Sequence, residues 1–60
     1  MRTVTITFTD KEVKEIKFVD HLLVHDGVLS LYRDRTYSGG RDHLGSWPLM
    51  NIKGWHAVES

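Results

Sequence analysis

Histidine is the residue type in this sequence best suited to bind a transition metal, and the chain has four: His21, His25, His43 and His56. His21 and His25 are four residues apart, which would place both on one face of a helix but about 13 Å apart along a strand. The other two histidines fall in unrelated segments, and no cysteine is available to complete a thiolate site. The sequence therefore predicts no bound metal and no cofactor.

The residue types of a Ser-His-Asp catalytic triad occur in Asp42-His43 together with Ser46 or Ser38. Catalysis requires that a nucleophile, a base and an orienting group converge in a cleft. Domains of this size seldom enclose a pocket of about 300 Å³ or more. We therefore expect that the protein is not an enzyme and has no small-molecule substrate.

Arginines and aromatic residues are mixed in the segment from residue 32 to residue 41. These residues are Tyr32, Arg33, Arg35, Tyr37 and Arg41. Such a mixture can stack on bases and pair with phosphates, and it is also enriched at protein interfaces. The simplest interpretation is a solvated loop whose arginines pair with Asp34 and Asp42. Eight basic and eight acidic residues give no net charge, so nucleic acid is the less favoured partner.

Trp47 and Trp55 are most simply core residues. If the alternation of a strand holds, however, Ile52 and Trp55 point to opposite faces of the last strand. One of the two tryptophans would then lie on an exposed apolar patch, which usually marks a partner surface. Leu23 and Val28, on the outer face of a predicted hairpin, would extend this patch.

Sixty residues allow a single domain, residues 1–60, whose core contributes a net stability of only about 3–5 kcal/mol. Without cysteine no disulfide can reinforce it, so self-association becomes an option. No apolar run is long enough for a signal peptide or a membrane helix. We expect a cytoplasmic protein without membrane contact.

The strict alternation from Thr3 to Phe8 predicts a strand with Val4, Ile6 and Phe8 facing the core. A three-residue loop at residues 10–12 would then place Ile6 opposite Ile16 and Val4 opposite Phe18 in a first hairpin.

A short helix is the alternative for residues 10–19. Thr9 and Glu12 match a capping box, and Val13, Ile16 and Val19 recur at helical spacing. The sequence favours the hairpin without excluding the helix.

Asp26-Gly27 predicts a second hairpin with a type I′ turn, since both central residues of that turn need a positive φ. Folding about this turn places Val24 opposite Leu29 and Leu22 opposite Leu31, all toward the core. The polar residues 34–43 then predict a loop of about ten residues. A short strand over 44–47, a tight turn over 48–51 and a last strand over 52–58 follow.

The stretch Ser46-Trp47-Pro48-Leu49-Met50-Asn51-Ile52 resembles the proline, the 3₁₀ turn and the last strand of SH3-like barrels. The acidic aromatic stretch with which peptide-binding SH3 domains bind proline-rich ligands is absent, so the resemblance does not imply that function. The whole chain is similar to small uncharacterised proteins of actinobacterial phages. The similarity lies in the threonine-rich first strand, the Asp-Gly-Val-Leu hairpin and the closing Trp-Pro-Leu-x-Asn-Ile-x-x-Trp segment. It implies a protein that binds a partner in the host bacterial cytoplasm, and it supplies no catalytic residues.

These patterns together predict an all-β protein: a small antiparallel sheet or a partly open SH3-like barrel of about five strands. Two hairpins and a C-terminal strand pair would build it. We expect it to act by protein–protein contact, with an unidentified protein or a second copy of itself as partner. The alternatives are nucleic-acid binding through the loop from Arg33 to Arg41, and a structural role as an assembly subunit.

Overall fold

The computed structural model describes residues 1–59, and in them the protein is all-β, as predicted. It has six strands and one 3₁₀ turn, whose bounds are β1 Arg2–Phe8, β2 Val13–Val19, β3 His21–His25, β4 Val28–Asp34, β5 Arg41–Pro48, η1 Leu49–Asn51 and β6 Ile52–Glu59.

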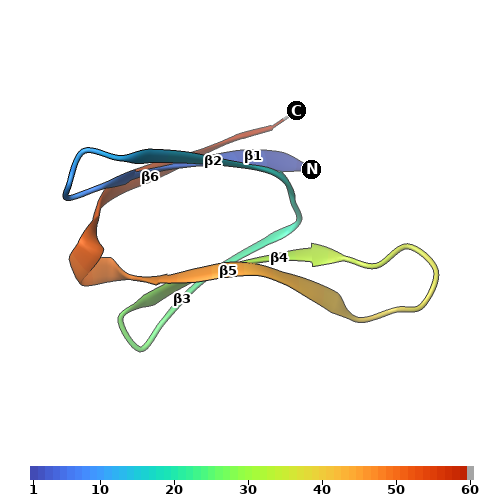
Figure 1. The fold of residues 1–60 in the computed structure, drawn as a ribbon. Helices are drawn as coiled ribbons and strands as arrows, with labels where there is room; N and C mark the ends of the chain where they lie inside the picture. The colour runs from blue at the N-terminus through green and yellow to red at the C-terminus, as the bar shows by residue number, and fades with distance from the viewer. Residues whose placement is uncertain (60) are drawn as a thin grey trace.

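The strands form two antiparallel three-stranded sheets, a first sheet in the order β2-β1-β6 and a second in the order β3-β4-β5. The sheets face each other without closing into a barrel (Figure 1). Only Asp20 separates β2 from β3, so one extended segment passes from the first sheet to the second. The predicted C-terminal strand pair is wrong, because β5 pairs with β4 while β6 pairs with β1.

The core lies between the two central strands. Val4 and Ile6 of β1, Leu29 and Leu31 of β4, and Val19 at the end of β2 are fully buried. Their spacing of two within β1 and within β4 follows from the alternation of side chains along a strand. We call the faces that carry these residues the inner faces of the sheets. The prediction that Val4 and Ile6 face the core is thus confirmed, and Phe8 packs against the same cluster.

The first hairpin is a hairpin and not a helix, but its loop consists of residues 9–11 and so lies one residue earlier than predicted. The Phe8 N–H donates to the Glu12 carbonyl and the Lys11 N–H donates to the Phe8 carbonyl. Lys11 takes the left-handed conformation, with φ 75°, that glycine usually supplies in such loops. The Asp10 carboxylate accepts the Glu12 N–H at 3.0 Å, which stabilises the turn locally.

This earlier position of the loop shifts the register of the hairpin by two residues. Ile6 lies opposite Lys14 and Val4 opposite Ile16, so the predicted pairs Ile6–Ile16 and Val4–Phe18 are wrong. A shift of two preserves side-chain parity, and Ile16 still packs against the core. Phe18 does not, because the pairing is irregular beside it and its φ is 61°; its side chain is exposed.

The second hairpin has the predicted register. The Asp26-Gly27 turn has φ values of 53° and 72°, as a type I′ turn requires. Val24 pairs with Leu29 and Leu22 with Leu31. Leu29 and Leu31 are buried and Leu22 packs against them, but Val24 is 48% exposed. The prediction that Val24 is a core residue is wrong, because β3 is an edge strand and the first sheet does not cover its end.

The predicted loop over residues 34–43 is largely a hairpin. The ladder of β4 and β5 continues through Arg33 opposite Asp42 and Asp34 opposite Arg41. Only residues 35–40 form the connection, and its two glycines, Gly39-Gly40, have positive φ. The predicted turn at residues 48–51 and the last strand are confirmed as η1 and β6.

No helix within residues 1–59 is long and apolar enough to cross a membrane.

Candidate functional site

The four residues of the predicted apolar patch lie on three different surfaces. Trp47 pairs with buried Leu29, so its side chain is on the inner face of the second sheet. Leu23 pairs with Ser30 and Val28 pairs with His25, which places Leu23 and Val28 on the outer face of that sheet.

Trp55 belongs to the other sheet. It pairs with buried Ile6 on the inner face of the first sheet, and it is 38% exposed. Ile52 pairs with Phe8, and a register shift between these two pairs leaves Lys53 as an extra residue in β6. Ile52 and Trp55 therefore share one face, and the prediction that they point to opposite faces is wrong.

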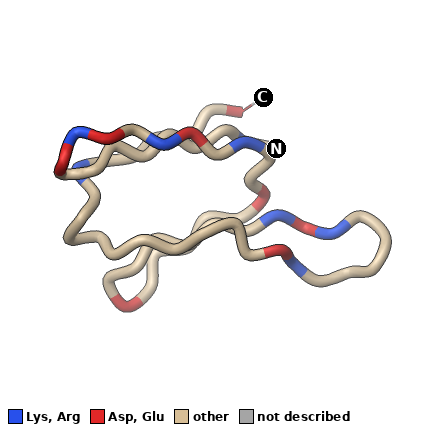
Figure 2. Tube along the Cα trace, viewed as in Figure 1, with Lys and Arg blue, Asp and Glu red and all other residues tan. Residues whose placement is uncertain are grey.

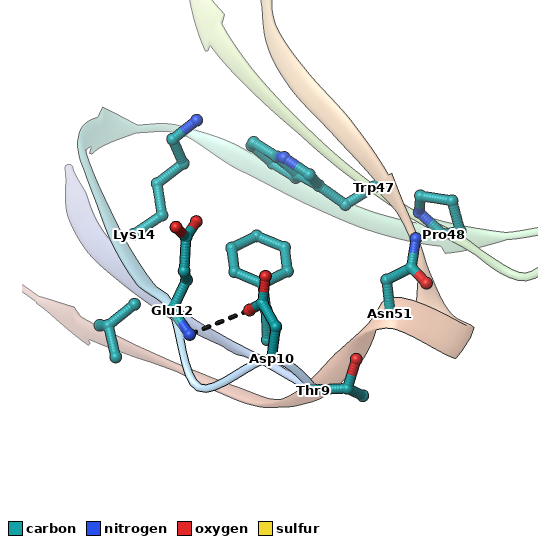
Figure 3. Close-up of a pocket in the computed structure, with 9 residues that line it drawn as sticks. Thr9, Asp10, Glu12, Lys14, Trp47, Pro48 and Asn51 are labelled. Carbon is teal, nitrogen blue, oxygen red and sulfur yellow. Dashed lines mark hydrogen bonds between the residues drawn. The ribbon is translucent and has the colours of Figure 1, made fainter.

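Trp47 forms one wall of a cavity of about 430 Å³ between the β1–β2 loop and the residues Pro48 and Asn51 at the two ends of the 3₁₀ turn (Figure 3). Its ring contacts the Phe8 ring edge to face, with 6.4 Å between centroids. The Lys14 ammonium lies 5.8 Å from the centroid of the Trp47 ring, so a cation already occupies the neighbourhood of the indole. The rim is polar, with the carboxylates of Asp10 and Glu12 on the loop side.

The arginines of the β4–β5 hairpin are paired with carboxylates. Arg35 Nε lies 2.8 Å from Asp42 Oδ1, and Arg33 Nη2 lies 3.9 Å from Asp42 Oδ2. Arg41 Nε lies 3.8 Å from Asp34 Oδ1. Figure 2 shows these opposite charges side by side along the two arms of the hairpin. The hairpin is thus a nearly neutral surface rather than a basic one.

Tyr37 at the end of this hairpin is fully exposed. A shallow groove of about 570 Å³ runs from the loop to Phe18 and Met1, and Arg33, Arg35 and Tyr37 line it. Three of the five predicted residues of this segment thus share one surface. Tyr32 lies elsewhere, stacked against His43 at 5.2 Å between ring centroids.

His43 and Ser46 come together on the open outer face of the second sheet. His43 Nε2 lies 2.6 Å from Ser46 Oγ, which is 2.8 Å from Ser30 Oγ. Asp42, the acid expected to orient the histidine, binds Arg35 instead. The arrangement is a chain of hydrogen bonds across neighbouring strands without the third member of a relay.

Two of the histidines pair with single carboxylates. His21 Nε2 lies 2.8 Å from Asp34 Oδ1, and His25 Nδ1 lies 2.9 Å from Asp26 Oδ2. Among the 59 described residues, no three His, Cys, Asp or Glu side chains are grouped as metal ligands would be.

The outer edge of β6 is a surface that sequence reasoning did not identify. Along β1, the Phe8 N–H points to β2 and the Thr9 N–H points to the β6 side, where it binds the Asn51 carbonyl. Odd-numbered residues of β1 therefore form the ladder with β6, and their partners there are Gly54, His56 and Val58.

The alternate residues of β6, Trp55 and Ala57, direct their N–H and C=O groups away from β1. Within the described chain β6 pairs only with β1, so this edge has no ladder partner. From Trp55 to Glu59 every residue is exposed. No pattern in a single sequence distinguishes such an edge from a central strand.

The structure thus offers three candidate surfaces: a cavity beside Trp47, a charge-paired hairpin, and the edge of β6 at Trp55. Comparison of the chain with protein-family models, with curated proteins and with solved structures finds no match.

Proposed function

We propose that this protein is a small non-catalytic β module that acts by protein–protein contact, and that the outer edge of β6 is its contact surface. The single observation that supports this proposal is the regular, unpaired edge from Gly54 to Glu59, which exposes Trp55, Ala57 and Val58. Such an edge is a template on which a strand of another chain can pair.

The other three edges carry features that oppose pairing. The edge of β2 has three charged residues and an irregularity at Phe18, while β3 is only five residues long. The edge of β5 has a register shift beside Leu44 and ends at Pro48. Charges, bulges, short strands and proline are the means by which proteins block edge pairing. From Gly54 onward, β6 has no proline and a regular register.

Nucleic-acid binding through the β4–β5 hairpin is less well supported. Arg33, Arg35 and Arg41 each have a carboxylate partner. Binding to phosphates would have to displace these partners, and the chain has no net charge to attract a polyanion.

The order of the strands also supports the proposal that the fold is related to a partly open SH3-like barrel. The order β6-β1-β2 continues through Asp20 into β3-β4-β5, and a 3₁₀ turn precedes the last strand. We take this similarity as a statement about fold alone.

The experiment compares the wild-type chain with the Trp55→Ala and Arg35→Ala variants, each first shown to be folded by circular dichroism. Each protein is immobilised and exposed to a bacterial lysate, and separately to the same protein in solution, at physiological and at high salt. Each is also titrated with a single-stranded oligonucleotide at both salt concentrations. We expect a protein partner that persists at high salt, is retained by Arg35→Ala and is weakened by Trp55→Ala. Oligonucleotide binding with a steep salt dependence that Arg35→Ala abolishes would overturn the proposal. So would the absence of any retained protein, the chain itself included.

A further inference from the structure

We infer that the partner at the β6 edge is a second copy of this chain, paired antiparallel with the first about a two-fold axis at His56. This inference rests on the proposed function, because it names the occupant of the same edge. It follows from the direction of the backbone groups, the sizes of the side chains and the charges along β6.

The backbone limits the possible registers. In a symmetric antiparallel pair, residues that turn their N–H and C=O groups outward must lie opposite one another. In β6 these residues include Trp55 and Ala57, so the axis must pass through a residue and not between two. Only an axis at Trp55, His56 or Ala57 pairs both of these residues within Lys53–Glu59. An axis at His56 places Trp55 of each copy opposite Ala57 of the other, with both pairs exchanging hydrogen bonds.

This register also places a large side chain against a small one at every exposed apolar position. On the inner face, Trp55 of one copy lies beside Ala57 of the other. On the outer face, Val58 lies beside Gly54, at which an added Cβ would meet nothing within 4 Å. The two first sheets would become one continuous six-stranded sheet, and the exposed part of Trp55 would be covered across the axis.

The charges along the strand select the same register. With the axis at His56, Lys53 lies opposite Glu59 at both ends of the pair. An axis at Trp55 would place Lys53 opposite Ala57, and an axis at Ala57 would place Trp55 opposite Glu59. Among the residues that the structure describes, Lys53 has no ion-pair partner of its own, which leaves it available to the second copy.

Glu59 already binds two cations within its own chain, the Met1 ammonium at 3.3 Å and Arg2 Nε at 3.6 Å. Its side chain is nevertheless 72% exposed. A Lys53 ammonium bound to this carboxylate would therefore lie close to both cations, and the contact between Lys53 and Glu59 is a modest, exposed one. Its role is to distinguish this register from those in which Lys53 faces Ala57 or Glu59 faces Trp55.

The first test substitutes proline at an outward-facing position. Ala57→Pro removes an N–H that the ladder with β1 does not use, so the domain should stay folded while the pair loses two symmetric hydrogen bonds. Val24→Pro is the matched control on the free edge of β3. The molar mass of the full chain is measured by sedimentation from about 1 μM to about 1 mM, the range in which a small interface should dissociate. We expect wild type and Val24→Pro to reach the dimer mass and Ala57→Pro to remain monomeric.

The second test reverses the charges of Lys53 and Glu59, and it tests the inferred register even if Ala57→Pro fails to fold. Lys53→Glu and Glu59→Lys should each weaken dimerisation by about fivefold or more, because two attractive pairs become repulsive. The double variant should restore most of the wild-type affinity. Thermal melts of all three variants show whether a change in mass reflects a change in folding.

The inference is overturned if the wild-type chain is monomeric throughout the concentration range, or if the double charge swap restores nothing. A dimer lost in Val24→Pro and kept in Ala57→Pro would move the interface to β3. A monomeric chain that still retains another protein through Trp55 would refute the second copy and leave the proposed function standing.

Discussion

Replacing Gly27 by valine tests the turn that joins β3 and β4. Gly27 has a φ of 72° and follows Asp26, whose φ is 53°. An added Cβ at Gly27 would meet no atom within 4 Å, so crowding contributes nothing to the cost. The loss of stability should come from the backbone alone, since a β-branched residue is strongly disfavoured at positive φ. We expect Gly27→Val to lower the free energy of unfolding by about 2 kcal/mol.

That loss is large for a domain of this size. A core this small gives a net stability of about 3–5 kcal/mol, so the variant should lose roughly half of it. At about 4–8 °C per kcal/mol, the melting temperature should fall by roughly 8–16 °C. The Gly27 carbonyl also accepts the Leu49 N–H at 2.8 Å, so a displaced turn would disturb η1 and the path of the chain into the first sheet. The whole domain should therefore unfold in one transition at the lower temperature.

Gly27→Asn is the matched control, because asparagine tolerates the left-handed conformation. We expect it to cost less than about 1 kcal/mol. Urea and thermal unfolding followed by far-ultraviolet circular dichroism would measure both variants. Equal stability of Gly27→Val and Gly27→Asn would refute the argument from φ.

Three further predictions concern other features of the fold. Lys11→Gly should raise the free energy of unfolding by up to about 1 kcal/mol in urea titrations, since Lys11 has a φ of 75°. Gly45→Ala should lower the free energy of unfolding by about 1–3 kcal/mol and change the indole fluorescence, because the new Cβ would lie 2.5 Å from Trp47 Cη2. Gly54→Ala is the control and should change the stability little, since there is open space around its Cβ. The melting temperature should be the same with and without EDTA, and a drop of several degrees would mean that the histidines bind a metal.

The parts of the fold that could be predicted are those with local signals in the sequence. The alternation around Val4 and Ile6 placed a strand and identified its buried face correctly. Asp26-Gly27 determined both the turn type and the register of the second hairpin. In each case the neighbouring residues alone decide the conformation, so the rest of the chain did not need to be known.

The register of the first hairpin could not be obtained in this way. It depends on where the loop begins, and the loop of residues 9–11 requires Lys11 to take a conformation typical of glycine. The extension of β4 and β5 was missed for a related reason. Cross-strand charge pairs such as Arg33 with Asp42 accompany that ladder, and a polar segment without alternation reads as a loop.

The positions of the candidate surface residues were mispredicted for the same reason. The parity argument for Ile52 and Trp55 assumes a regular strand, and the extra residue at Lys53 reverses its conclusion. Sequence alone also could not separate Trp47 from Leu23, because their positions depend on which residues of β4 they pair with. The sequence predicted that one of the two tryptophans is exposed without deciding which, and in the structure it is Trp55.

The exposure of Trp55 follows from its position as an inner-face residue on an edge strand. Its partner Ile6 is fully buried because β1 has a strand on each side and the second sheet beneath it. Trp55 faces the same core but has a neighbouring strand on one side only. More apolar residues elsewhere in the chain would not change this, whereas one added strand would. In the dimer that we infer, a second β6 would supply that strand and place its smallest inner-face side chain, Ala57, beside the indole. The side chain that the single chain leaves exposed would then be the one that selects the partner.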